Sequence, residues 1–176
     1  EQIEGNALML MISENLRIGL LTDHLPINEI SEAITPELIK QKIKTINQSL
    51  IQDFNIIKPK IALLGLNPHS GDNGVIGKEE IETIFPTIKE LLNEGYIVNG
   101  PFSADAFFGN EQYLNYDAVV ACYHDQGLIP FKSLSFGEGV NYTAGLEKIR
   151  TSPDHGTAYD IAGKNIANHT SFTEAI

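Results

Sequence analysis

The fold is decided by the stretch Asp117-Ala-Val-Val-Ala-Cys-Tyr-His-Asp-Gln-Gly-Leu-Ile-Pro-Phe-Lys132, in which an apolar run ends at a His-Asp pair. The run from Ala118 to Tyr123 predicts a buried strand. In alternating α/β chains the ligand crevice opens at the carboxyl ends of such strands. Position alone therefore makes His124, Asp125 and Lys132 candidate site residues, with Asp125 and Lys132 the candidates for catalysis.

Two more histidines follow strand-like segments. His24 comes after the run from Ile18 to Thr22, and His69 comes after the run from Lys60 to Leu66. A single histidine in this position is most often a satisfied polar residue at the edge of the core. His24, His69 and His124 together predict a metal site assembled by the fold, because their wide separation fits no local zinc motif and three imidazoles leave open positions for water or substrate.

Strand-like and helix-like segments alternate along the chain. This alternation predicts a single α/β domain over residues 1–176, with a largely parallel sheet covered on both faces. Strands are expected at Arg17–Thr22, Lys60–Leu66, Tyr96–Asn99, Asp117–Tyr123 and Val140–Gly145. Helices are expected at Gly5–Leu16, from Pro36 behind the capping Thr35, at Glu79–Asn93 with a kink or a second start at Pro86, at Ala104–Leu114, and from Thr157 to Ala162.

Composition excludes several classes of protein. The 176 residues carry a net charge of -11 with only 12 Lys and Arg, which argues against a nucleic-acid surface. No apolar run is long enough to span a membrane, and the single cysteine, Cys122, suits a reducing compartment, so we expect a cytoplasmic protein. The chain begins at Glu1 without a methionine, and we expect it to be a fragment of a longer, two-domain enzyme that lacks its N-terminal half.

A second group of polar residues follows the central strand. Lys132, Asn141 and Arg150 are spaced across a glycine-rich stretch. They are either ordinary surface residues or an anion clamp in which a lysine charge, an amide and a guanidinium bind carboxylate or phosphate. Asp105, Asp125 and Asp154 could be partners of a metal, a water or a histidine, and Asp125 is favoured because it adjoins His124.

Nucleotide-binding loops are not recognisable. The loop before Lys78 resembles a P-loop, but it has Asp72 in place of the first glycine and Glu79 in place of the hydroxyl residue. No Gly-x-Gly-x-x-Gly turn is present either, so the residues that would bind a dinucleotide stay unassigned.

Six motifs in succession resemble the signature blocks of the 4-hydroxythreonine-4-phosphate dehydrogenase family of pyridoxal phosphate biosynthesis. They are Thr22-Asp-His-Leu-Pro26, Gly65-Leu-Asn-Pro-His-Ser-Gly71, Gly100-Pro-Phe-Ser-Ala-Asp105, Tyr123-His-Asp-Gln-Gly-Leu128, Gly139-Val-Asn-Tyr-Thr143 and Ile149-Arg-Thr-Ser-Pro-Asp-His-Gly-Thr157. The resemblance implies a three-layer α/β/α fold like that of isocitrate and isopropylmalate dehydrogenases. It also implies a homodimer, NAD or NADP as oxidant, and a divalent metal ion such as Zn, Mg, Mn or Co.

The resemblance assigns roles to the candidate residues. It implies that His24, His69 and His124 ligate a metal shared between the subunits, and that Lys132, Asn141 and Arg150 contact a phosphorylated substrate. The expected reaction is oxidation and decarboxylation of 4-phosphohydroxy-L-threonine to 3-amino-2-oxopropyl phosphate.

Other functions stay open at this point. A related dehydrogenase of a phosphorylated sugar acid, such as a 4-phosphothreonate or 4-phosphoerythronate, would share the same blocks. A P-loop-like phosphotransferase and a noncatalytic binding module stabilised by a metal are the further alternatives.

Overall fold

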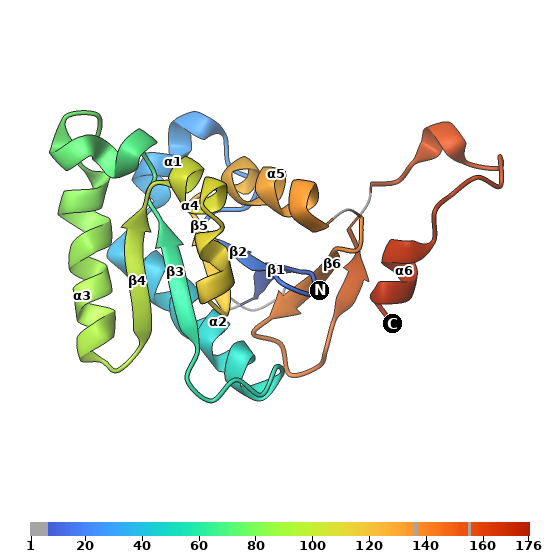
Figure 1. The fold of residues 1–176 in the computed structure, drawn as a ribbon, viewed down its shortest axis with the longest axis horizontal. Helices are drawn as coiled ribbons and strands as arrows, with labels where there is room; N and C mark the ends of the chain where they lie inside the picture. The colour runs from blue at the N-terminus through green and yellow to red at the C-terminus, as the bar shows by residue number, and fades with distance from the viewer. Residues whose placement is uncertain (1–6, 136, 155) are drawn as a thin grey trace.

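A single seven-stranded sheet organises the chain (Figure 1). The computed structural model describes residues 7–135, 137–154 and 156–176. The strands lie in the order β4-β3-β5-β2-β1-β6-β7. Their bounds are β1 Leu8–Ile12, β2 Arg17–Leu20, β3 Lys60–Leu64, β4 Ile97–Phe102, β5 Ala118–Ala121, β6 Val140–Ala144 and β7 Thr151–Pro153.

The sheet is parallel in the half that carries the central strand. Strand β5 pairs in parallel with β3 and with β2, and β3 pairs in parallel with β4. Strand β1 is antiparallel to both of its neighbours, β2 and β6, and β7 is antiparallel to β6. Five of the seven strands therefore run in one direction, which confirms the predicted mostly parallel sheet.

Helices cover both faces of the sheet. Helices α1 (Ile27–Ala33), α2 (Pro36–Gln52) and α3 (Phe85–Asn93) pack on one face, and α4 (Ala104–Gly109) and α5 (His124–Ser135) pack on the other (Figure 1). The predicted α/β/α layering is confirmed. Shorter elements are the 3₁₀ turns Pro68–Gly74, Gln112–Asn115 and Tyr159–Ile161, the π-helical turn Glu80–Ile84, and α6 (Thr170–Glu174).

Helix α2 shows how the sequence produces one layer. The Thr35 side chain caps it by accepting the backbone N–H of Leu38 at 3.2 Å, and Pro36 supplies a preset first helical residue. Ile39, Ile43, Ile46 and Leu50 recur at helical spacing and are fully buried against the sheet. The helix approaches β2 so closely that a Cβ on Gly19 would lie 2.6 Å from Ile46 Cδ1.

Some expected elements differ in the structure. The expected helix Gly5–Leu16 is wrong, because Leu8–Ile12 forms β1, and the start of that segment lies outside the described residues. A short apolar run with both faces buried carries no helical or strand period that would tell the two apart. For Pro86 the sequence predicted either a kink or the start of a second helix. The second outcome is found, since α3 begins at Phe85 after the π-helical turn.

Several further elements differ, and α1, α6 and β7 were not predicted. The segment Ala104–Leu114 divides into α4 and a 3₁₀ turn, and residues 157–162 form only a 3₁₀ turn. Helix α5 was not predicted, because Gly127 and Pro130 lie inside it. Gly127 is required there, since a Cβ would lie 2.8 Å from Leu20 Cδ2 and 2.9 Å from Ile18 Cγ2.

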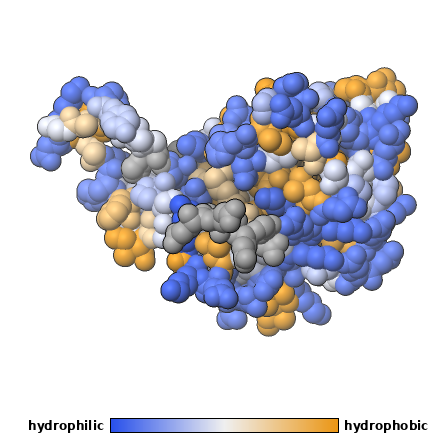
Figure 2. Space-filling model, turned by 180° about the vertical axis from the view of Figure 1, so that it is seen from behind, coloured by the Kyte–Doolittle hydropathy of each residue, from blue (hydrophilic) through white to orange (hydrophobic). Residues whose placement is uncertain are grey.

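The segment after β7 leaves the body of the fold and returns to α6 beside the outer strands (Figure 1). Seen from behind, the surface mixes hydrophilic and hydrophobic residues, and hydrophobic ones also gather near the C-terminus (Figure 2), where Phe172 and Ile176 are exposed. Within the described residues, no helix has the length and apolarity needed to cross a membrane.

Candidate functional site

Three neighbouring parallel strands lead into the three histidine segments. Strand β5 lies between β3 and β2, so the carboxyl ends of all three strands meet at one edge of the sheet. His24 follows β2, His69 lies in the 3₁₀ segment after β3, and His124 is the first residue of α5, just after β5. The fold therefore gathers the predicted histidine segments at one edge, as ligand sites of such sheets require.

His24 and His124 form a close pair. Their ring centroids are 5.5 Å apart, with the rings tilted by 44°. Both side chains border a cavity of about 440 Å³ that is also lined by Asp23, Tyr123 and Asp125. One oxygen of Asp23, Oδ1, is buried and has no hydrogen-bond partner. The cavity thus holds two imidazoles and carboxylate oxygen atoms, which are suitable donors for a divalent transition metal.

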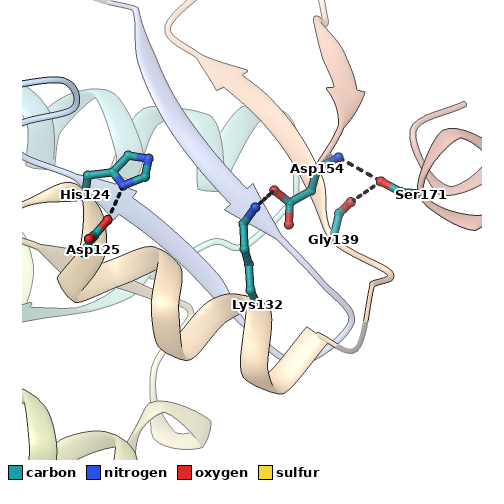
Figure 3. A network of polar contacts seen from close by, with 6 residues as sticks. All are labelled: His124, Asp125, Lys132, Gly139, Asp154 and Ser171. Carbon is teal, nitrogen blue, oxygen red and sulfur yellow. Dashed lines mark hydrogen bonds and ion pairs between the residues drawn. The ribbon is translucent and has the colours of Figure 1, made fainter. Parts of the chain in front are cut away.

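Asp125 fixes the orientation of the His124 ring. Its Oδ1 lies 2.7 Å from His124 Nδ1 (Figure 3). Because a carboxylate only accepts, the proton of the neutral imidazole resides on Nδ1 and the lone pair on Nε2 is left free. This is the tautomer that a metal ligand bound through Nε2 needs.

His69 lies in a loop with an unusual backbone. The five residues from His69 to Asn73 all have positive φ, and Ser70 Oγ anchors the turn by donating to Pro101 O at 3.1 Å. Glu80, only 3% exposed, accepts the backbone N–H of Asn67 at 2.7 Å and its side-chain amide at 3.0 Å. A buried carboxylate therefore holds the start of the loop that presents His69.

The same loop has a second acidic anchor. Glu79 accepts from Ser31 Oγ at 2.6 Å and from Asn67 Nδ2 at 2.7 Å. The Ser31 bond is the main cause that lowers the pKa of Glu79, and the backbone and Asn67 bonds add to it. Glu79 thus ties the His69 loop to α1, which begins next to His24.

Within the described residues, His69 does not join the histidine pair in a group that could hold a metal ion. Among the described residues, no group of three or more His, Cys, Asp or Glu side chains lies close enough to hold a metal ion. His69 instead contributes to lowering the pKa of Asp105, for which the Ser103 hydroxyl bond at 2.6 Å is the largest cause. A metal bound by His24 and His124 therefore needs a further ligand brought to the cavity.

Two of the three candidate anion-binding residues, Lys132 and Arg150, have side-chain partners within the chain. Lys132 Nζ lies 3.3 Å from Asp154 Oδ1, and Arg150 Nη1 donates to Thr143 Oγ1 at 2.8 Å. Asn141 Oδ1 is buried without a hydrogen-bond partner. Asp154, the partner of Lys132, directly follows β7, and Asn141 pairs with Ser152 of that strand.

Lys132 belongs to the same helix as His124. Figure 3 shows both side chains rising from one side of α5, with Lys132 reaching Asp154 near β7. Ser171 of α6 accepts the backbone N–H of Asp154 at 2.8 Å and donates to Gly139 O at 3.0 Å. Asp154, which the sequence offered as a partner of metal, water or histidine, is thus the partner of Lys132.

Sequence reasoning missed the supporting residues Thr22, Glu80 and Gln126. Thr22 and Gln126 lie in recognised motifs, and a polar residue next to a strand end is the signal that could have found them. Glu80 lies in the π-helical turn after the His69 loop, and no motif marks it. Cys122 is excluded as a nucleophile, because complete burial raises the pKa of its thiol far above the ordinary range.

The whole chain, residues 1–176, matches the family described as pyridoxal phosphate biosynthetic protein PdxA. The chain belongs to the PdxA family. A 4-hydroxythreonine-4-phosphate dehydrogenase of Bacteroides thetaiotaomicron is 51% identical over 173 residues, which are 98% of this chain and 48% of that protein. A relative of the same name from Sulfurihydrogenibium is 49% identical and matches 96% of this chain.

Solved structures agree with this membership in the PdxA family. The crystal structure of 4-hydroxythreonine-4-phosphate dehydrogenase from Klebsiella pneumoniae superposes with a TM-score of 0.86 at 37% identity, over 98% of this chain and 52% of that one. A terephthalate 1,2-cis-dihydrodiol dehydrogenase from Burkholderia xenovorans superposes with a TM-score of 0.76 at 30% identity. The chain spans about half the length of the relatives that it matches.

Proposed function

We propose that the intact protein is a metal-dependent NAD or NADP dehydrogenase that oxidises and decarboxylates 4-phosphohydroxy-L-threonine to 3-amino-2-oxopropyl phosphate. The observation that carries the proposal is the His24–His124 pair, with ring centroids 5.5 Å apart at the edge of a PdxA-family sheet. The relatives with the highest identity reported above bear the name of this enzyme.

The residues present fit a divalent ion. His24 and His124 would provide two imidazole ligands, and His69 would provide the third. When bound, such an ion supplies a Lewis acid that lowers the pKa of the substrate hydroxyl and stabilises negative charge developing on that oxygen. Asp125 keeps the His124 ring in the ligating tautomer through its contact with Nδ1 at 2.7 Å.

We infer that His69 reaches the pair from a second subunit. In the described part of one chain, His69 does not join His24 and His124 in a three-residue group. Apolar side chains beside both segments are open, with Ile27 84% and Val75 82% exposed, as a packing surface for another chain requires. A homodimer with twofold symmetry would then contain two identical shared sites.

NAD or NADP takes up the two electrons that the oxidation releases. The carbon that bears the hydroxyl loses a hydride to NAD or NADP, and the hydroxyl loses its proton. Asp125 is 71% exposed and lines the cavity, so its carboxylate would accept that proton. The resulting β-keto acid then loses carbon dioxide, and protonation of the remaining enolate gives the amino ketone.

Lys132, Asn141 and Arg150 would hold the substrate phosphate. Lysine provides a compact charge, arginine a two-pronged donor, and the Asn141 side-chain amide a neutral hydrogen bond. Such remote contacts orient the reacting carbon, which raises the rate of the chemical step. When the anion binds, the Lys132 ammonium group would either move away from Asp154 or contact both Asp154 and the anion.

The test uses the intact protein stripped of metal with a chelator. We expect no reduction of NAD or NADP by the stripped protein, and recovery when Zn²⁺, Co²⁺ or Mn²⁺ is added with 4-phosphohydroxy-L-threonine. His24→Ala and His124→Ala should each lose stoichiometric metal. Undiminished metal in both variants would contradict the histidine site.

The same assay distinguishes the alternative substrates. A higher kcat/KM with 4-phosphothreonate or 4-phosphoerythronate would assign the protein to sugar-acid oxidation, and the structural similarity to a dihydrodiol dehydrogenase shows that this fold accepts other alcohols. Cytoplasmic location is part of the proposal, because the expected substrate and cofactors are cytoplasmic metabolites.

A further inference from the structure

The three histidine segments meet at one buried residue, Cys122, at the end of β5. Its carbonyl oxygen accepts Thr22 Oγ1 at 2.8 Å and the Thr22 N–H at 3.3 Å, which ties the segment of His24 to it. Its thiol donates to Leu64 O at 3.3 Å, at the end of β3. Its own N–H donates to Gln126 Oε1 at 2.7 Å.

Gln126 continues this network towards the His69 loop. Its Nε2 donates to Gly65 O at 2.7 Å, while its Oε1 accepts from Cys122. Gly65 begins the loop that carries His69, and Gln126 lies two residues after His124 on α5. One amide side chain therefore bridges the two segments that present His69 and His124.

Only an amide satisfies both ends of this bridge. The Cys122 N–H needs an acceptor, and the Gly65 carbonyl needs a donor. A carboxylate in the same place keeps the acceptor but sets an oxygen against the Gly65 oxygen. An aliphatic side chain leaves both backbone groups unpaired in a partly buried position.

We propose that Gln126 is a positioning residue, which sets the spacing and orientation of the His69 loop relative to His124. The proposal rests on the proposed metal-dependent function. In the twofold dimer, the spacing between His124 and the His69 loop of one chain sets the spacing between that chain's own site and the site to which it lends His69, so both sites depend on it. Pairing within the sheet fixes the ends of β3 and β5, but it does not fix the segments after them, which carry His69 and His124. Gln126 is the side chain that joins those following segments directly.

Cobalt binding to the intact protein tests this role without an activity assay. The metal-free protein is titrated with Co²⁺, and the dissociation constant is obtained from the visible absorption of the bound ion and from competition with Zn²⁺. We expect Gln126→Leu and Gln126→Glu to bind Co²⁺ about 10–100-fold more weakly than the wild type, the range for residues that orient metal ligands.

A matched control separates positioning from loss of stability. Thr87 is 1% exposed on α3, where its Oγ1 donates to Thr83 O at 2.7 Å, and it lies outside the histidine segments. Thr87→Val removes a buried hydrogen bond, so we expect lower stability with unchanged Co²⁺ affinity. If Gln126→Leu does not fold, Gln126→Glu decides the question.

The outcomes distinguish this proposal from the function on which it rests. If the wild type binds Co²⁺, His124→Ala loses it, and both Gln126 variants bind as tightly as the wild type, the positioning role is wrong. If His124→Ala binds Co²⁺ as the wild type does, the histidine site itself is wrong. Weaker binding in the Gln126 variants, with wild-type affinity in Thr87→Val, supports the positioning role.

Discussion

At His124, a single carboxylate contact decides which ring nitrogen is available to a ligand. Asp125 lies at Nδ1, so Nε2 keeps its lone pair. Two other candidate residues also have side-chain partners: Lys132 lies beside the Asp154 carboxylate, and Arg150 donates to the Thr143 hydroxyl. The sequence favoured Asp125 as a partner because it adjoins His124, but it did not predict the contacts of Lys132 with Asp154 or of Arg150 with Thr143.

Arg150 offers a test of the phosphate role. Arg150→Lys keeps the positive charge but loses the planar pair of donors, so we expect the KM for the phosphorylated substrate to rise about tenfold, equal to ~1.4 kcal/mol of lost binding. The KM for an unphosphorylated analogue should change little. Steady-state kinetics on the intact enzyme measure both values, and an equal loss for both substrates would contradict a phosphate contact.

Tyr142 gives a prediction that depends on pH. Its hydroxyl donates to Asp53 Oδ2 at 2.6 Å, and burial, followed by that bond, raises the pKa of Tyr142 above its ordinary value. A raised folded-state pKa contributes stability that is complete below the unfolded-state pKa, about 10, and is lost as the pH rises above it. Tyr142→Phe should cost about 1 kcal/mol of unfolding free energy near neutral pH.

The difference between wild type and Tyr142→Phe should therefore narrow in alkaline solution. Urea unfolding at a series of pH values from neutral to above the tyrosine range measures it. The variant has no hydroxyl to titrate, so only the wild type loses this contribution. A difference that stays constant across the series would show that the raised pKa is not coupled to folding.

At the scale of elements, the sequence predicted strands and helices well where the period or the caps are clear. Helix α2 has a capping threonine and four buried isoleucine or leucine positions at helical spacing, and it forms as expected. Strand β1 was mistaken for a helix, and α5 was missed because of Gly127 and Pro130. Tertiary packing decides both cases, since each element is completed by neighbours from distant parts of the chain.

The arrangement of the site was predictable only in part. Parallel strands share one carboxyl edge, so the sequence could gather the three histidine segments there. It could not predict that His24 and His124 form a ring pair, or that His69 lies in a loop of residues with left-handed backbone conformation. That outcome depends on loop conformation, which Glu80 and Gln126 hold through long-range hydrogen bonds.

The His69 loop yields an element-scale prediction. At Gly71, with φ +79°, an added Cβ would lie 2.6 Å from Glu80 Oε2 and 2.7 Å from Gly77 O. At Gly95, with φ +96°, an added Cβ meets nothing within 4 Å. Gly95→Ala should therefore cost ~1 kcal/mol from the backbone alone, and Gly71→Ala an additional ~1–3 kcal/mol from overpacking.

Urea unfolding of the two alanine variants measures this difference. Gly71→Ala should also weaken Co²⁺ binding, because the displaced loop carries His69, while Gly95→Ala should bind as the wild type does. Equal loss of stability in both variants would contradict the tight packing of Glu80 under the loop.

At the scale of the whole molecule, the chain spans about half the length of its relatives, and its described residues bring together no three side chains that could hold a metal ion. In the proposed metal site, the third ligand would come from His69 of a second subunit or from a part of the protein outside this chain. A twofold dimer predicts the first, because it brings one loop of each subunit to the cavity of the other. The sequence predicts which histidines are ligands, but not which chain supplies each one.

Subunit mixing separates these sources most directly. Full-length His69→Ala and His124→Ala proteins, each inactive alone, are mixed under conditions in which subunit exchange is demonstrated. In a mixed dimer, one site receives His24 and His124 from the first chain and His69 from the second, so activity and bound metal should recover to roughly a quarter of the wild-type level.

The control mixture of His24→Ala with His124→Ala should recover nothing, since both residues belong to the same chain's pair. No recovery in the first mixture, or equal recovery in both, would contradict a metal site built from the His24–His124 pair of one subunit and His69 of the other.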